Sequence, residues 1–327
     1  MVVVWRVTAR CGLACPFCGY DASLDRPRAD ADEATVLSFG EALAGYARLS
    51  GKPVHVSWLG GEPFLWPPLA RVERIFAGTY GLGLGITTNG VALAGSDMME
   101  KLLACYDEVT VSVDGIGAAH DSLRSWPGGY ALLAGRVPEL ARRGAARSPR
   151  LVVRVNALLT RGTVDGFGDL VDEMAAWGVS ELSFNALGGI ERPEYHRLHR
   201  LLPDQVERLA DELPGLRKRA AARGMSLLGN AEYAGRLLSW VRGQRLPIDD
   251  CSPWENFMFI DEGGTAAPCH ASLAERGVHI ETLRSGDDIA LLVASAGSEG
   301  SAAAKPAACA DCPSTRVFGK FRREEQP

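Results

Sequence analysis

Three cysteines near the start of the chain have the spacing of a metal-binding loop. Cys11, Cys15 and Cys18 stand in the segment CGLACPFC. Three thiolates from one short loop can hold three irons of a cubane [4Fe–4S] cluster, whereas clusters with only protein ligands usually have four cysteines. Zinc is the alternative, but it favours a fourth Cys or His ligand, and the next histidine is His55. The loop therefore predicts a cluster with one iron left open.

A second set of cysteines lies toward the other end of the sequence. It consists of Cys251, Cys269, Cys309 and Cys312, with seventeen residues between the first two and two between the last two. Four sulfurs would saturate a second cluster or a zinc site, and the spacing leaves both open. Cys105 stands apart, and we interpret it as a small buried residue.

Composition and charge limit the class of protein. The 327 residues are 46% hydrophobic and 23% charged, which allows two domains with a sizeable core. The net charge of −5 disfavours a nucleic-acid partner. Apolar runs such as 151–160 fall short of the roughly 20 residues of a membrane span. Without a signal-peptide pattern, we expect a cytoplasmic protein whose clustered cysteines are ligands or catalysts, with no nucleic-acid and no membrane partner.

Strand-like and helix-like segments alternate through the first 190 residues. Strands are expected over 2–10, 55–59, 82–88, 108–113, 151–159 and 181–187, with helices over 34–49, 69–77, 98–106, 130–143 and 164–177. Repeated β–α order requires a parallel sheet, because a parallel neighbour is reached only through a crossover. The fold class predicted is α/β, a partial (β/α)6 barrel of the TIM type. Helices are expected over 202–223 and 232–242.

Several motifs stand where the predicted strands end. They are Gly60-Gly61-Glu62-Pro63 after the second strand, Thr88-Asn89 after the third, and Ser112 with Asp114 after the fourth. The carboxyl ends of barrel strands meet at one rim, where chemistry collects. Arg154 and Asn156 share one face of the fifth strand. For Arg154, contact with a bound ligand and a plain salt bridge both remain open.

The triad and the motif after the second strand resemble the radical S-adenosylmethionine (SAM) enzymes. Cys11, Cys15 and Cys18 match the family's cysteines, with Phe17 as the aromatic before the third. The resemblance implies that the amino and carboxylate groups of SAM chelate the open iron. It further implies that an electron from the cluster cleaves SAM to a 5′-deoxyadenosyl radical, which abstracts hydrogen from an unactivated C–H bond. An electron donor such as flavodoxin or ferredoxin is then expected.

The same resemblance implies roles for the residues at the strand ends. Contacts to SAM are expected from Gly60, Gly61, Glu62, Pro63, Thr88, Asn89, Ser112, Arg154 and Asn156. Asp114 is expected to be catalytic, as the base of an oxidation. The segment with His120, Asp121 and Arg124 also resembles the peptide-maturing and sulfatase-maturing branches of the family.

The second cysteine set is similar to the twitch domain, a truncated form of the SPASM extension. This resemblance implies an auxiliary [4Fe–4S] cluster that acts as an electron acceptor, a conduit or a structural staple. We expect a radical SAM partial barrel over 1–190, a helical connector over 191–245 and a small cysteine-rich, twitch-like α+β domain over 246–327.

The domain pattern resembles the twitch enzymes of antibiotic biosynthesis, which predicts a small-molecule substrate. That substrate would be a sugar, aminocyclitol or nucleoside, oxidised or dehydrated by a radical SAM oxidoreductase or lyase. The alternative is a maturase of ribosomal peptides. Those enzymes commonly have an N-terminal leader-recognition module and two auxiliary clusters, whereas this sequence enters its first strand at Val2. An epimerase, which needs a spare cysteine, and a non-enzymatic iron–sulfur or zinc scaffold are weaker readings.

Overall fold

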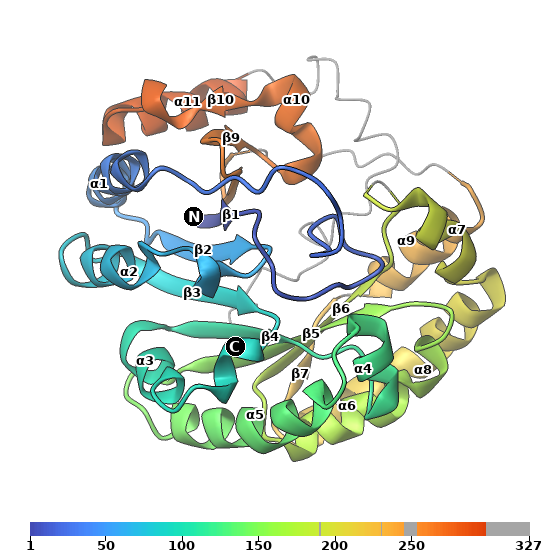
Figure 1. The fold of residues 1–327 in the computed structure, drawn as a ribbon. Coiled ribbons are helices and arrows are strands. Elements are labelled where there is room, and N and C mark those ends of the chain that lie inside the picture. Colours follow the sequence, from blue (N-terminus) through green and yellow to red (C-terminus); the bar gives the residue numbers. More distant parts are fainter. Residues whose placement is uncertain (190, 230, 245–253, 299–327) are drawn as a thin grey trace.

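The computed structural model describes residues 1–189, 191–229, 231–244 and 254–298. Its centre is a curved sheet of parallel strands joined by helices (Figure 1). The six strands of the predicted barrel are β1 (Val2–Thr8), β2 (His55–Gly60), β3 (Gly83–Thr88), β4 (Glu108–Ser112), β5 (Val152–Leu159) and β6 (Glu181–Ala186). Each pairs in parallel with its neighbour in the chain. The predicted α/β partial barrel is therefore confirmed.

Helices connect the strands, and most of them cover the outer side of the sheet (Figure 1). They are α1 (Glu33–Ser50), α2 (Leu69–Gly78), α3 (Met98–Cys105), α4 (Ala118–Arg124), α5 (Gly129–Ala145), α6 (Phe167–Ala176), α7 (Pro193–His199), α8 (Pro203–Ala222) and α9 (Ala231–Val241). The first is well capped: the Asp32 carboxylate accepts a hydrogen bond from the Thr35 N–H at 2.8 Å, and Gly51 ends the helix at a φ of 67°. None of the helices in the described ranges combines the length and hydropathy that a bilayer crossing needs.

The sheet continues past both ends of the predicted barrel. Its order is β10-β9-β8-β1-β2-β3-β4-β5-β6-β7. The added strands are β7 (Ser226–Leu227), β8 (Phe257–Ile260), β9 (Thr265–Ala267) and β10 (Val278–His279). Strand β8 is parallel to β1, while β9 and β10 are antiparallel to their neighbours. The described part of 246–327 thus extends the barrel sheet, with α10 (Leu273–Arg276) and α11 (Gly286–Ser298) following, and α11 packs against α1.

Strand alternation gives the sheet an apolar outer face. Trp5 of β1 and Trp58 of β2 point to the helices, with ring centroids 5.9 Å apart. Both pack on Phe76 of α2, at 6.4 and 5.0 Å, and Trp5 also meets Phe39 of α1 at 5.7 Å. These side chains are fully or almost fully buried. They fix the first two strands, and so the loops that leave them, against the helical layer.

The opposite, inner face of the sheet is polar. Asn156 of β5 accepts hydrogen bonds through Oδ1 from Ser183 Oγ at 2.8 Å and Asn185 Nδ2 at 3.0 Å on β6. Ser57 of β2 and Thr110 of β4 also stand at positions that face this inner side of the sheet, and both are buried. An inner face of this kind can surround a polar ligand at the carboxyl ends of the strands.

Candidate functional site

The cysteine loop follows β1, and side chains within this segment hold it by hydrogen bonds to its backbone. The Arg28 guanidinium donates to the carbonyl oxygens of Ala9, Tyr20, Asp21 and Leu24 at 2.5 to 3.2 Å. Thr8 Oγ1 donates to Asp30 at 2.6 Å. A charged group that satisfies several carbonyls at once fixes a loop without regular structure. Sequence reasoning did not single out Arg28.

The three thiols of the triad lie together in this loop. Burial raises the pKa of each, and that of Cys15 to about 12. Backbone N–H groups point at the sulfurs: Leu13 N lies 3.5 Å from Cys11 Sγ, and Tyr20 N lies 3.3 Å from Cys18 Sγ. Buried thiols are costly to ionise unless a metal takes up the charge, and N–H donors to sulfur are typical around iron–sulfur clusters.

The donor set is chemically suited to an iron–sulfur cluster, because thiolates are the usual ligands of its irons. A cubane takes each sulfur on a different iron, so its ligands need not converge on one point. The triad therefore suits the predicted cluster, with Cys11, Cys15 and Cys18 as its ligands.

The glycines of the GGEP motif let the turn after β2 pack closely against the cysteine loop. The N–H of Gly61 donates to the Thr8 carbonyl at 2.8 Å, and the N–H of Glu62 donates to the Arg10 carbonyl at 2.7 Å. A Cβ on Gly61 would lie 2.3 Å from the Arg10 carbonyl oxygen, and one on Gly60 would lie 2.8 Å from that of Thr8. The close approach that glycine allows here is to the backbone leading into Cys11. Contact of Gly60, Gly61 and Pro63 with SAM stays a prediction.

Glu62 ties the ends of two strands together. Its buried carboxylate accepts hydrogen bonds from Thr88 Oγ1 at 2.9 Å, Asn89 N at 2.8 Å and Phe64 N at 3.4 Å. Burial outweighs these donors and raises the pKa of Glu62 to about 7. Asn89, positioned in this way, places Nδ2 3.7 Å from Cys11 Sγ. The predicted motifs after β2 and β3 and the triad thus form one connected group.

Asp114, after β4, is paired rather than free. Its side chain is fully buried, and Arg124 donates to both carboxylate oxygens, at 2.5 Å from Nε and 3.2 Å from Nη2. The N–H of Leu158 donates to Oδ1 at 2.8 Å. His120 accepts from the Asp114 N–H through Nδ1 at 3.2 Å. A role for Asp114 as a base stays a prediction, and it requires the pair with Arg124 to open first. Ser112 is buried at the end of β4.

Arg124 is a site residue that the predicted set of ligands did not include. It ends α4, and its guanidinium lies 5.5 Å from the centre of the Phe17 ring, between Cys15 and Cys18 in the sequence. Its carbonyl oxygen lies 3.5 Å from Cys15 Sγ. The signal for it was present in the sequence, in the segment shared with His120 and Asp121.

Arg154 occupies a different position from the one predicted for a ligand contact. Its guanidinium pairs with Glu108 at 2.7 Å and Glu181 at 2.5 Å, which are the first residues of β4 and β6. These residues begin their strands, whereas the triad and the motifs follow strand ends. The structure shows the second of the two readings, a buried salt bridge, and contact of Arg154 with SAM stays a prediction. Asn156 lies two residues nearer the strand end, and its contact with SAM stays a prediction.

The second cysteine set is only partly described. Cys269 follows β9, and its thiol lies 3.3 Å from Ser272 Oγ. Cys251, Cys309 and Cys312 lie outside the described residues. The auxiliary cluster, like the division into 1–190, 191–245 and 246–327, stays a prediction.

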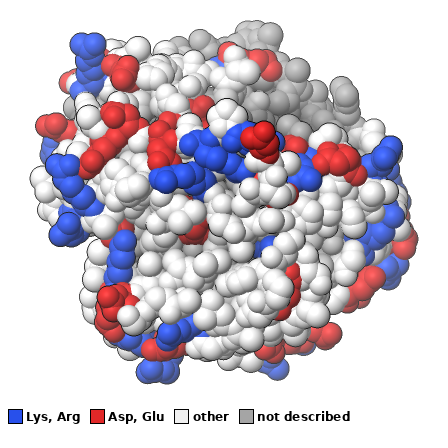
Figure 2. All heavy atoms as spheres, viewed as in Figure 1, with Lys and Arg blue, Asp and Glu red and all other residues white. Residues whose placement is uncertain are grey.

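Three exposed apolar side chains follow the three strands whose ends carry motifs. Leu65, Val91 and Ile116 stand in the loops after β2, β3 and β4 and are 42%, 39% and 41% exposed. We name these three residues the apolar rim. On the face drawn in Figure 2, positive and negative side chains are intermixed, and the surface over the ends of β3 and β4 has few of either.

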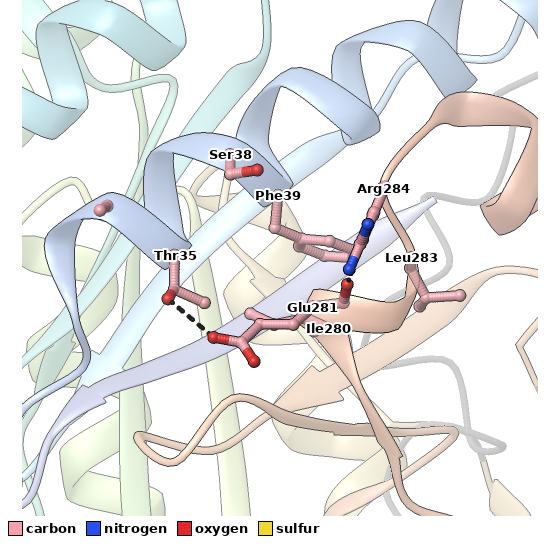
Figure 3. A pocket seen from close by; sticks show the side chains of 8 residues that line it. Thr35, Ser38, Phe39, Ile280, Glu281, Leu283 and Arg284 are labelled. Carbon is pink, nitrogen blue, oxygen red and sulfur yellow. Dashed lines mark hydrogen bonds between the residues drawn. The ribbon is translucent and has the colours of Figure 1, made fainter.

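A surface pocket lies elsewhere, between α1 and the segment before α11. It has a volume of about 410 Å³ and is lined by Thr35, Ser38 and Phe39 on one side and by Glu281 and Arg284 on the other (Figure 3). Thr35 Oγ1 lies 3.5 Å from Glu281 Oε1 across it. None of its lining residues belongs to the triad or the strand-end motifs, so we do not assign the site to it.

The family model that matches the chain describes the radical SAM superfamily and covers residues 5–131. Two curated relatives match this chain over different lengths. Pre-heme d1 synthase of Dinoroseobacter shibae is 36% identical over 145 residues, covering 44% of this chain but only 34% of that protein. PqqA peptide cyclase of Xanthomonas axonopodis pv. citri is 26% identical over 306 residues, covering 86% of this chain and 71% of that protein.

Solved structures show the same fold. SuiB of Streptococcus suis bound to S-adenosylmethionine matches with a TM-score of 0.63 and 18% identity, over 86% of this chain and 63% of that one. SuiB bound to its precursor peptide SuiA matches with a TM-score of 0.61.

These findings correct the predicted substrate. Relatives named as peptide cyclases favour the alternative reading, a peptide maturase, over a sugar, aminocyclitol or nucleoside enzyme. They leave the cofactor class unchanged, because the family implies a [4Fe–4S] cluster and SAM. The matched residues contain the triad, the GGEP turn and the Asp114–Arg124 pair, and this part of the chain is a radical SAM domain.

Proposed function

We propose that this chain is a radical SAM enzyme that modifies a peptide, in the manner of a maturase of ribosomal peptides. The observation that carries the proposal is the match to PqqA peptide cyclase, which runs through 86% of this chain and so extends well beyond the matched family domain. The likeness to SuiB supports the fold that such an enzyme would use.

In this proposal Cys11, Cys15 and Cys18 hold a [4Fe–4S] cluster, and the loops after the strands bind SAM. When bound, the two supply one-electron cleavage of SAM, which starts hydrogen abstraction from an unactivated C–H bond. The proposed contacts to SAM are Gly60, Gly61, Glu62, Pro63, Thr88, Asn89, Ser112 and Asn156. Glu62 holds the loops after β2 and β3 in register with the triad through its hydrogen bonds to Thr88 and Asn89.

The reaction class follows from the peptide reading. A cyclase closes a bond between two residues and must remove two hydrogens, which makes the overall reaction an oxidation. We include in the proposal an auxiliary cluster at Cys251, Cys269, Cys309 and Cys312 as the electron acceptor, and an external donor such as flavodoxin or ferredoxin for the first electron. Four cysteines saturate such a cluster, so it would leave no iron for the substrate.

The test is an anaerobic incubation of the reconstituted full chain with SAM, a reductant and candidate precursor peptides. We expect 5′-deoxyadenosine to form, a peptide to lose two hydrogens by mass spectrometry, and deuterium to move from the labelled peptide into 5′-deoxyadenosine. Cys11→Ala should abolish all three results. Cys105→Ala, a matched change at the half-buried end of α3, should leave them intact. Deuterium transfer from a sugar or nucleoside, and from none of the peptides, would refute the proposal.

A further inference from the structure

We propose that Arg124 is a positioning residue that raises the reduction potential of the cluster held by Cys11, Cys15 and Cys18, through a fixed positive charge that Asp114 partly balances. The inference rests on the cluster in the proposed function, and it does not depend on the substrate being a peptide.

Arg124 contacts the triad loop through both its backbone and its side chain. Its carbonyl oxygen lies 3.5 Å from Cys15 Sγ, and its guanidinium lies 5.5 Å from the centre of the Phe17 ring. Phe17 is the residue before Cys18, so the charge lies beside the loop between two of the three ligands. The side chain of Arg124 is only 11% exposed, which limits screening by water.

The charge of Arg124 is held in a fixed position beside the triad loop. Its Nε lies 2.5 Å from Asp114 Oδ2 and its Nη2 lies 3.2 Å from Asp114 Oδ1. The N–H of Leu158 in turn donates to Asp114 Oδ1 at 2.8 Å, so the carboxylate is fixed as well. Arg124 therefore presents a cation of fixed position to the cluster that the triad would hold.

The direction of the effect follows from electrostatics. Reduction adds a negative charge to the cluster, and a nearby buried cation stabilises that added charge. Local charge is one of the factors that set cluster potentials. Removing the charge of Arg124 should lower the potential, whereas removing the charge of Asp114 should raise it. Since both changes break the same ion pair, a purely structural role would move the two variants in the same direction.

The test is a redox titration of the reconstituted full chain, followed by electron paramagnetic resonance of the reduced cluster. The signal that changes when SAM is added identifies the cluster at the triad. The variants are Arg124→Gln, Arg124→Lys and Asp114→Asn, and iron content is measured for each. We expect Arg124→Gln to make reduction about tenfold less favourable, a downward shift of about 59 mV for one electron. Arg124→Lys should stay near the native potential, and Asp114→Asn should shift upward.

The signs of the shifts in reduction potential decide the outcome. An unchanged potential in Arg124→Gln, or shifts of the same sign in Arg124→Gln and Asp114→Asn, would overturn the inference. If Arg124→Gln fails to assemble a cluster, Arg124→Lys and Asp114→Asn still test it, because a downward shift in Asp114→Asn contradicts it. Absence of a SAM-sensitive cluster in the native chain would instead refute the proposed function.

Discussion

Replacing Glu62 by Gln should remove a large pH dependence of stability. Burial raises the pKa of Glu62 from its ordinary value of 4.5 to about 7. Between these two values the unfolded chain releases the proton while the folded chain keeps it, so unfolding becomes more favourable as the pH rises. Below pH 4.5 both states are protonated, and above pH 7 both are ionised, so the loss of stability is confined to this interval.

The magnitude follows from the same two values. Each pH unit in the interval changes the free energy of unfolding by about 1.4 kcal/mol. The interval from 4.5 to about 7 therefore gives a loss of about 3 kcal/mol in the native chain. Gln does not titrate, and its amide oxygen can still accept from Thr88 or Asn89. One donor is left without its partner in the variant, which costs about 1 kcal/mol relative to the ionised carboxylate.

The assay is urea denaturation of the metal-free, reduced chain at several pH values between 4.5 and 8. The quantity of interest is the free energy of unfolding of Glu62→Gln minus that of the native chain, because this difference cancels the titration of all other groups. It should rise by about 3 kcal/mol across the range. Glu100→Gln is the matched control: that glutamate is 70% exposed in a surface pair with Arg143, and its difference should stay flat. A difference for Glu62→Gln that does not vary with pH would refute the reasoning.

Two further substitutions test the packing around the site. Gly61→Ala should destabilise the chain by about 3 kcal/mol in thermal unfolding and reduce iron uptake, because its Cβ would meet the Arg10 carbonyl oxygen at 2.3 Å. Gly135→Ala, in α5 with no atom within 4 Å of its Cβ, should instead stabilise by about 0.5–1 kcal/mol. Arg154→Met should cost about 3–5 kcal/mol in urea denaturation by leaving two glutamates unpaired. It should leave the potential of the SAM-sensitive cluster unchanged, and a shifted potential would contradict its assignment as a salt bridge.

Local pattern was enough to predict the barrel. β-branched residues marked β1, β4 and β5, and the motifs fell at strand ends because loops there are free to carry glycine and polar residues. The order of β and α segments then left a parallel sheet as the solution. The strand β8, by contrast, pairs with β1 across more than two hundred residues of sequence. Four residues of apolar sequence do not specify a partner at that distance.

The candidate site was predictable in its residue types but not in its pairings. The sequence analysis placed Glu62 only in the motif after the second strand, whereas its carboxylate crosses to Thr88 and Asn89 at the end of the next strand. Period-two alternation correctly put Arg154 on the face shared with Asn156. The alternation did not predict that the guanidinium of Arg154 would pair with Glu108 and Glu181 at the start of the two neighbouring strands. The substrate was mispredicted because the number of cysteines constrains the clusters and says little about which substrate the barrel binds.

Arg154 and Arg124 show how the inner barrel separates structure from chemistry. Arg154 meets two carboxylates where the strands begin, so that group has a net charge of −1 with each charge in direct contact with an opposite one. Arg124 meets one carboxylate where the strands end, and the charge of that pair sums to zero before any sulfur is counted. Three thiolates and a cluster would add negative charge beside it. A cation balanced by only one carboxylate therefore stabilises an electron added to a nearby cluster better than a cation balanced by two. The need to stabilise such an added charge distinguishes this end of the barrel from the other.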